Sequence, residues 1–478
     1  MERRSLIIYL VLAIVLAGCT REQKITTSSP EALRCYNEGV DRWKNFYYQE
    51  AKSVLDSAIS LDSTFAMAWA RLALVDEGMR NEAQSKLHIE RARRYSSNAS
   101  RREQLFINMW YHKINYAFKE AVTAADSLIA LSPEDAEAHA FRGIMYEEAK
   151  DFEAAIRSYE RATKVDTGYA PAVMSLGYAY STMGEQSKAI AQMKRYIRMA
   201  PTAADPRASY ADLLLRVGRY EEALSQYTKS LELKPDYWYS INQIGNVYII
   251  QGRLREAEEQ FHKGLTLLLQ SQQLESSHLS VDATLNVLRG DYPRAIEQYI
   301  RALTIDSTNS GPAYGLVNAF IQMKKFKEAD ATISRIRVEL DRRNLGESQA
   351  MLGFFLARAR FLTAQGQLME ALAVCDSALD HSSPLTRGVV YRQVAEIRLE
   401  QRQYEGAFDA CEEALRANPN NPDALLTLMK VYHAKGDLRM THEIGGRLLE
   451  FWKNADADFR YLGDVKKMLA GNRSGVSA

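Results

Sequence analysis

Ten alanines recur at a nearly constant spacing along this chain, and the residue four places after each of them is usually larger and apolar. Five consecutive ones, from Ala121 to Ala257, are each 34 residues apart. A self-similar period of this length predicts a stacked array of small units rather than an enzyme domain with a single core. The ten alanines are Ala51, Ala121, Ala155, Ala189, Ala223, Ala257, Ala295, Ala329, Ala371 and Ala407, and the residues four places on include Leu55, Tyr159, Met193, Tyr227, Phe261, Tyr299 and Ile333.

Each period contains the signals of two helices joined by a short turn. A second small residue precedes most of the alanines by twelve positions, and small residues in matched places let two helices approach closely. In six periods a glycine follows this position by seven residues, where a helix end needs a positive φ. The small residues are Gly39, Gly143, Gly177, Ala211, Gly245, Ala283, Ala359 and Ala395; the glycines are Gly184, Gly218, Gly252, Gly290, Gly366 and Gly436; prolines near the ends of periods are Pro133, Pro201, Pro235 and Pro419.

This order of small residue, glycine turn, alanine and terminal proline resembles the tetratricopeptide repeat. The resemblance implies an all-α fold, a right-handed α-solenoid of about twelve helix-turn-helix repeats, covering residues 30–455. Residues 456–478 are then expected to form a C-terminal capping helix and tail. Aligning the alanines gives repeats at 32–65, 66–101, 102–135, 136–169, 170–203, 204–237, 238–271, 276–309, 310–343, 352–385, 388–421 and 422–455.

The resemblance also implies a partner-binding surface, because first helices line the concave groove in this repeat family. Amide side chains there can bind a peptide backbone without demanding a sequence, and tyrosines are common interface anchors. The alternative is that these residues are ordinary polar side chains on an unused face. The residues expected to bind partners are Met174, Tyr178, Asp212, Tyr239, Asn242, Asn246, Tyr314 and Asn318.

The N-terminus has the features of a secretory signal. Arg3 and Arg4 precede an apolar run that ends in Leu16-Ala17-Gly18-Cys19, and the run is well short of the ~20 residues that a transmembrane helix needs. The last four residues resemble the lipobox of bacterial lipoproteins. That resemblance implies that residues 1–18 are a cleaved signal peptide and that Cys19 carries acyl chains, such as palmitate, that anchor the protein in a membrane.

Residues 19–29 then form a lipidated tether, and the first helix is expected to start at Ser29-Pro30-Glu31, an N-cap, an N1 proline and a first-turn acid. Thr20 stands where the lipoprotein family often uses Asp to signal retention in the inner membrane. Its presence favours the outer membrane, with the repeats facing the periplasm.

Charge argues against a nucleic-acid partner. The formal net charge is +1, from 61 basic and 60 acidic side chains, so the chain has no broad basic field. Five arginines cluster between Arg91 and Arg102, but stacking aromatics are not interleaved with them. Ser100 and Glu103 have the spacing of a capping box at the start of a helix.

Catalytic and cofactor motifs are missing from the sequence. It has no phosphate-binding loop, no nucleophile elbow, no dinucleotide fingerprint and no zinc-binding His-Glu-x-x-His motif. Cys375 and Cys411 occupy core positions four residues after repeat alanines, which predicts buried free thiols rather than a disulfide. We therefore expect no enzyme activity, no metal, no cofactor and no small-molecule substrate.

The sequence thus predicts a lipid-anchored scaffold that mediates protein–protein interactions in the bacterial cell envelope. The alternative is a non-catalytic regulatory or substrate-presenting subunit of an envelope enzyme, or of a secretion or pilus machine. Neither the partner nor the machine can be identified from the residues alone.

Overall fold

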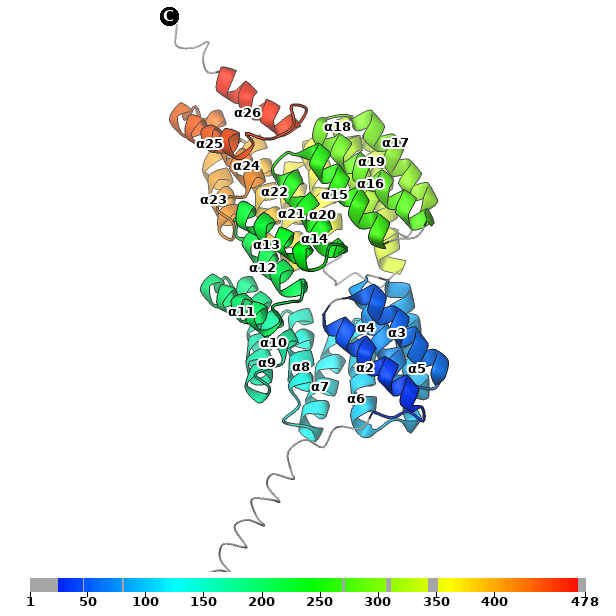
Figure 1. Ribbon diagram of the computed structural model, residues 1–478. Helices are drawn as coiled ribbons and strands as arrows, with labels where there is room; N and C mark the ends of the chain where they lie inside the picture. The colour runs from blue at the N-terminus through cyan, green and yellow to red at the C-terminus, as the bar shows by residue number, and fades with distance from the viewer. Residues whose placement is uncertain are drawn as a thin grey trace, which may run out of the picture. The chain divides into compact units, whose positions relative to one another are not determined.

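A computed structural model describes residues 25–45, 47–79, 81–268, 271–306, 311–342 and 351–471. These residues form the α-helices α2 to α26 and one short 3₁₀ turn, and no strand occurs among them (Figure 1). The predicted all-α repeat fold is confirmed. Backbone contacts divide the chain into two compact units, Met1–Ser175 and Leu176–Ala478, here called unit 1 and unit 2. Each is described by itself.

Unit 1 contains four helix hairpins and the beginning of a fifth first helix. Two of its helices start as the sequence predicts. The Ser29 side chain accepts a hydrogen bond from the Ala32 N–H, with Pro30 in the first turn, and Ser100 and Glu103 form a reciprocal capping box. The helices are α2 (Pro30–Lys44), α3 (Tyr48–Leu61), α4 (Ala66–Gly78), α5 (Glu82–Tyr95), α6 (Arg101–Ile114), α7 (Phe118–Leu131), α8 (Ala136–Glu148), α9 (Phe152–Val165) and the start of α10 (Ala170–Thr182).

Unit 2 continues the same alternation and ends in a single helix. Its helices after α10 are α11 (Gln186–Met199), α12 (Asp205–Arg216), α13 (Tyr220–Leu233), α14 (Trp238–Ile250), α15 (Leu254–Leu268), α16 (Ser271–Arg289), α17 (Tyr292–Ile305), α18 (Gly311–Gln322), α19 (Phe326–Arg342), α20 (Met351–Ala364), α21 (Leu368–Asp380), α22 (Arg387–Glu400), α23 (Tyr404–Leu415), α24 (Pro422–Lys435), α25 (Leu438–Phe451) and α26 (Arg460–Gly471).

The repeat alanines lie in the cores of the hairpins. All ten have an exposed fraction of 0%. The matched small residues lie against the large side chain four places after the alanine: a Cβ at Gly143 would come within 2.4 Å of the Tyr159 ring, and one at Gly39 within 2.7 Å of Leu55. The packing of these hairpins therefore requires a small residue on the first helix where the second carries a large one.

The turns between paired helices share one backbone conformation. All six predicted turn glycines have positive φ, between 71° and 85°. In four other hairpins the matched position is held by a residue with a side chain, Tyr116, Lys150, Lys324 or Arg402, with φ between 57° and 63°. The turn geometry is thus set by the repeat, and glycine is the residue that adopts it with least strain.

First helices lie closer together than second helices within each unit. Successive first helices touch, as in α4 with α6 of unit 1 and α20 with α22 of unit 2, whereas successive second helices make no comparable contact in the described part of the chain. Each array therefore curves toward its first helices, whose outward-facing side chains form what we call the inner face.

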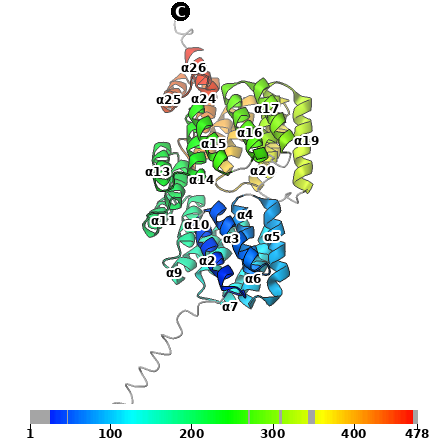
Figure 2. The same ribbon diagram turned by 45° about the vertical axis from the view of Figure 1, so that its right-hand side comes forward.

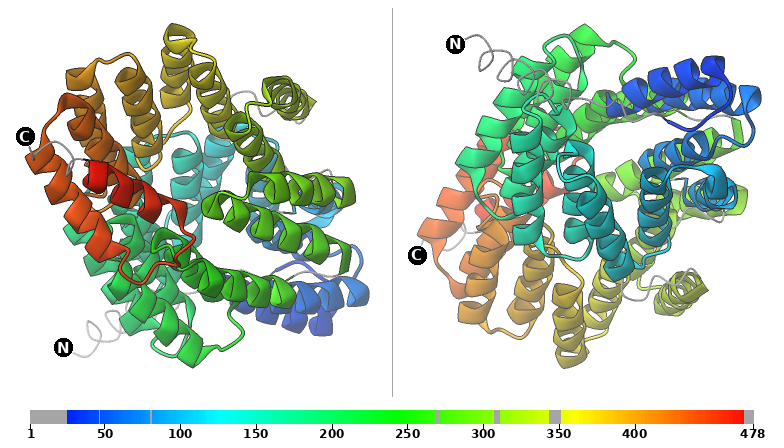
Figure 3. Two further views of the ribbon diagram at one scale, coloured as in Figure 1. Left: turned by 90° about the horizontal axis from the view of Figure 1, so that it is seen from above. Right: turned by 90° about the horizontal axis from the view of Figure 1, so that it is seen from below.

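Unit 2 also closes on itself, which the sequence did not lead us to expect. Helices α24 to α26 lie beside α13 to α16, as the differing views in Figures 2 and 3 show. Trp452, only 1% exposed, shares one core with Leu254 and Leu285. The Trp452 indole N–H donates to the carbonyl of Ile250 at 2.9 Å, and the Asp456 N–H donates to the carbonyl of Gly252 at 2.9 Å. We call this contact the seam.

The expected signal peptide, Cys19 and the first part of the expected tether lie outside the described residues. The end of the tether is attached to unit 1: the Thr26 hydroxyl donates to Glu103 at 2.6 Å and the Thr27 hydroxyl to Asp62 at 2.6 Å. Among the described helices, none combines the length and the apolar character needed to cross a membrane.

Candidate functional site

Three of the predicted partner-binding residues meet in one hydrogen-bonded cluster on the inner face of unit 2. The hydroxyls of Tyr178 on α10 and Tyr239 on α14 donate to the same carboxylate oxygen of Asp212 on α12, at 2.8 and 2.7 Å. Tyr227 donates to the other oxygen at 2.5 Å. Asp212 is only 8% exposed. These hydroxyls are therefore engaged within the protein, and their first role is to join three consecutive repeats.

A second carboxylate lies beneath this cluster. Asp205 at the start of α12 is 5% exposed and accepts hydrogen bonds from Tyr196 at 2.8 Å and from Tyr237 at 2.9 Å. Burial raises the pKa of Asp205 to about 7, although the two tyrosine hydroxyls act to lower it. The inner face at this point is a network of tyrosines around two carboxylates rather than an open polar strip.

The two predicted asparagines do not act together. Asn246 is exposed and its amide donates to the side-chain oxygen of Gln243 at 2.7 Å. The amide oxygen of Asn242, in contrast, is buried against Gly264 of α15, where an added Cβ would lie 2.3 Å away. Asn242 therefore does not present its amide oxygen beside Asn246, because this oxygen fills the space that a glycine leaves between α14 and α15.

The remaining predicted residues are spread along the chain. Met174 is half-buried on α10 but lies in unit 1. Tyr314 and Asn318 are half-buried on α18, and the Tyr314 ring lies against Gly353 of α20, 3.1 Å from where a Cβ would be. The structure therefore brings together Tyr178, Asp212 and Tyr239, with Asn246 nearby through Gln243, which also donates to Asp212 at 3.2 Å.

The inner face becomes charged toward the C-terminal repeats. Arg392 on α22 pairs with Glu396 at 2.7 Å, whereas Arg360 on α20 donates to the amide oxygen of Gln393 at 3.2 Å. Burial and the neighbouring Arg392 lower the pKa of Arg360. This end of the inner face thus carries two guanidinium groups that interact with two carboxylates, Glu396 and Asp423.

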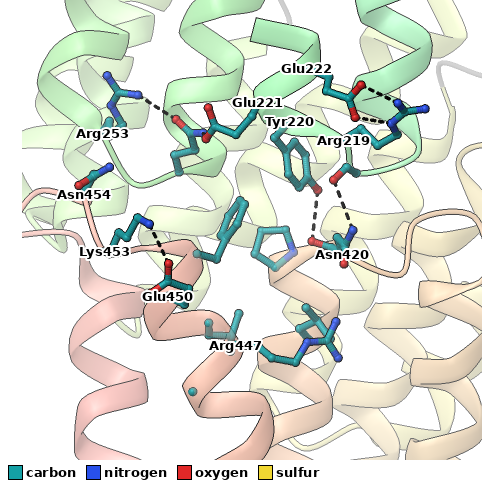
Figure 4. A pocket seen from close by; sticks show the side chains of 17 residues that line it. Arg219, Tyr220, Glu221, Glu222, Arg253, Asn420, Arg447, Glu450, Lys453 and Asn454 are labelled. Carbon is teal, nitrogen blue, oxygen red and sulfur yellow. Dashed lines mark hydrogen bonds and ion pairs between the residues drawn. The ribbon is translucent and has the colours of Figure 1, made fainter. Parts of the chain in front are cut away.

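A pocket of about 800 Å³ lies at the seam of unit 2 (Figure 4). One wall comes from the turns before α13 and α15, and the other from α24 and α25. Its floor is apolar: the ring of Tyr220 lies 5.3 Å from that of Phe451, measured between centroids, with Leu425 and Leu448 beside them. The Tyr220 hydroxyl is held by the amide of Asn418 at 3.0 Å. Two segments about 200 residues apart in sequence thus build one concave, ring-lined site.

The rim of this pocket is charged. Arg219 forms a forked ion pair with Glu222, and Lys453 pairs with Glu450 at 2.7 Å. Glu221 accepts a hydrogen bond from the Gln251 amide at 2.8 Å. Arg447 on α25 is exposed and makes no ion pair within the described residues. Sequence reasoning missed this site, because no local pattern relates Tyr220 to Phe451.

The two cysteines of the later repeats lie in the protein core. Cys375 and Cys411 are free and fully buried, as predicted, and burial raises the pKa of each thiol to about 12. A thiol with such a pKa is a poor nucleophile and a poor metal ligand at neutral pH. Among the described residues, no group of three or more His, Cys, Asp or Glu side chains is arranged to hold a metal ion.

Comparison with known families finds tetratricopeptide-repeat models at three places. They match residues 118–171, 148–204 and 174–237 in overlapping copies, then residues 239–268 and residues 398–439. The matched segments include α7 to α15, which contain the tyrosine network, and α23 and α24 at the seam.

Curated relatives are distant and match only parts of their own length. Superkiller complex protein 3 of Mus musculus is 24% identical over 50% of this chain, but the match spans 16% of the mouse protein. Signal recognition particle subunit SRP72 of Dictyostelium discoideum is 24% identical over 41% of this chain and 28% of its own. A repeat-containing protein of Methanocaldococcus jannaschii is 22% identical over 50% of this chain and 37% of its own. Among solved structures, a crystal structure of MamA is 24% identical with a TM-score of 0.29, covering 33% of this chain and 93% of that one.

Proposed function

We propose that this chain, a tetratricopeptide-repeat protein, is a scaffold that binds protein partners and is held by a lipid anchor in the bacterial cell envelope. The observation that carries the binding role is the repeat array itself, whose stacked hairpins present an inner face and a seam pocket built from several repeats. Such extended surfaces suit the recognition of other proteins.

The inner face contributes different chemistry along its length. Around Asp212 it is a fixed tyrosine network, and around Arg360 and Arg392 it carries charges of both signs. Rigid tyrosines provide contact area at low entropic cost, and guanidinium groups pair with carboxylates in a defined geometry. We propose that Tyr178, Tyr239, Asn246, Tyr314 and Asn318 contribute to partner binding, and that Asp212 and Asn242 support them from within.

The anchor is argued from the leader that ends in Leu16-Ala17-Gly18-Cys19. Two or three acyl chains at Cys19 would hold the protein stably, whereas one chain gives only marginal membrane binding. Thr20 supports an outer-membrane location. Attachment of Thr26 and Thr27 to unit 1 leaves residues 20–25 as the spacer, which spans at most ~22 Å when extended, so unit 1 would lie near the membrane surface.

The substitution Cys19→Ser tests the anchor. We expect an uncleaved precursor or a protein released into the soluble fraction, measured by membrane fractionation and intact mass. Normal removal of the leader together with unchanged membrane recovery would rule out Cys19 as the acylated residue.

A second candidate function is a non-catalytic regulatory or substrate-presenting subunit of an envelope enzyme or of a secretion or pilus machine. Purification of the tagged chain from solubilised membranes separates the two. A scaffold should recover several structural partners, whereas a regulatory subunit should recover one catalytic partner at a fixed ratio.

A further inference from the structure

The seam pocket has the composition of an anchor site for a peptide side chain. Its floor joins the rings of Tyr220 and Phe451 with Leu425 and Leu448, and its volume of about 800 Å³ exceeds what a single side chain fills. An apolar floor with aromatic rings favours an aromatic guest, because offset ring contacts add to the burial of apolar surface.

Some charged side chains at the rim of the pocket form ion pairs, and others do not. Arg219 and Lys453 are neutralised by Glu222 and Glu450, and Arg253 pairs with Glu256. Glu221 and Arg447 form no ion pair among the described residues, although Glu221 accepts a hydrogen bond from the Gln251 amide and also interacts electrostatically with Arg253 and Lys453. Figure 4 shows these two on opposite sides of the ring-lined floor.

We infer that the seam pocket binds an extended peptide segment of a protein partner that inserts one aromatic side chain, with an acidic residue toward Arg447. This inference rests on the proposed scaffold function and specifies the partner's chemistry. The apolar floor selects the aromatic residue, and the position of Arg447 to one side of it fixes where the acidic residue of the peptide lies.

The structure offers a matched pair of substitutions to test the pocket. Gly446 lines the pocket on α25, and a Cβ there would meet nothing within 4 Å. Gly446→Phe should therefore fill the pocket without disturbing the helix. Gly463 on α26 is equally unobstructed but does not line the pocket, so Gly463→Phe is the control for adding a phenylalanine to a helix surface.

The probe is a displayed library of random dodecapeptides, selected on the full chain purified in detergent and depleted on the Gly446→Phe variant. Enriched peptides should share an aromatic residue with an acidic residue on one side of it. Synthetic copies should lose at least about tenfold in affinity on Gly446→Phe, a change of ~1.4 kcal/mol, and should bind Gly463→Phe as they bind the wild type.

Charge reversal tests where the acidic residue of the peptide lies. Arg447→Glu should weaken the acidic peptide by about tenfold, whereas Arg439→Glu, an exposed arginine on the same helix outside the pocket, should not. Replacing the peptide's acid by its amide should remove the difference between wild type and Arg447→Glu.

The pocket assignment is overturned if no peptide is enriched, if enriched peptides bind Gly446→Phe as tightly as wild type, or if Arg447→Glu leaves their affinity unchanged. If the proposed scaffold function is wrong, the experiment gives a different result. If membrane purification recovers the same partners with wild type and Gly446→Phe, the scaffold stands and the pocket proposal falls. If wild type recovers none, the scaffold itself is wrong.

Discussion

Lys324 occupies the turn position where six other hairpins have glycine, with φ of 57°. A residue with a Cβ pays about 1–2 kcal/mol in this region, and glycine costs about 0.5–1 kcal/mol in unfolded-chain entropy. Lys324→Gly should therefore stabilise unit 2 by up to about 1 kcal/mol. Lys325, the next residue, is also exposed but does not have a positive φ, so Lys325→Gly should be neutral or destabilising. The urea unfolding midpoints of both variants test this prediction. Equal shifts of the two midpoints relative to wild type would show that the turn is not strained.

Asp205 makes the stability of unit 2 depend on pH. Burial raises its pKa from 3.8 to about 7. Between about pH 4 and 7 the folded protein keeps a proton that the unfolded chain has lost, so this group's contribution to stability is complete below pH 4 and is lost as pH rises through 7. Asp205→Asn should remove that contribution. The measurement is the urea unfolding midpoint at pH 5 and pH 8. If the midpoint depends on pH identically in wild type and variant, the predicted contribution of Asp205 is contradicted.

At the scale of helices, the hairpins could be predicted because their determinants are local. Gly143 and Tyr159 are 16 residues apart, and several other repeats carry the same relation between a small and a large residue, such as Gly39 with Leu55 and Gly245 with Phe261. The side-chain directions within a repeat were harder to predict. Asn242 has the spacing of an inner-face residue, yet Gly264 on the partner helix creates the space that its amide oxygen occupies.

Ala223→Glu tests whether the hairpin requires a small, buried residue at the position of the repeat alanine. Ala223 is 0% exposed on α13, and burying an unpaired carboxylate there should cost a few kcal/mol. Because repeats are stabilised by their neighbours, the denaturant transition should broaden or split. Ser225→Glu adds the same charge at an exposed position of the same helix and should leave the transition nearly unchanged. A wild-type midpoint and steepness for Ala223→Glu would contradict the assignment.

At the scale of unit 2, the seam could not be predicted from the sequence. Trp452 and Ile250 are 202 residues apart, and Arg255 and Asp456 are 201 apart. No period links them, because their meeting depends on the accumulated curvature of the intervening repeats. The seam pocket could not be predicted for the same reason.

Trp452→Ala should open the seam and cost about 3–5 kcal/mol. The backbone amide hydrogen of Asp456, which is donated to the Gly252 carbonyl, should then exchange faster with solvent. Protection from hydrogen exchange should also fall at the turn between α14 and α15. Lys453→Ala, at the exposed neighbour, should change neither. If loss of protection were confined to α24–α26, the two ends of unit 2 would be energetically independent.

The most direct test of the central claim is quantitative mass spectrometry of proteins that copurify with the tagged, full chain from solubilised membranes. We expect several partners with wild type, a reduced set with Tyr178→Ala and Tyr239→Ala combined, and none enriched with a Cys19→Ser variant that has left the membrane. Recovery of a single enzyme at a fixed ratio would favour the regulatory-subunit alternative. Recovery of no protein above an untagged control would contradict the scaffold function.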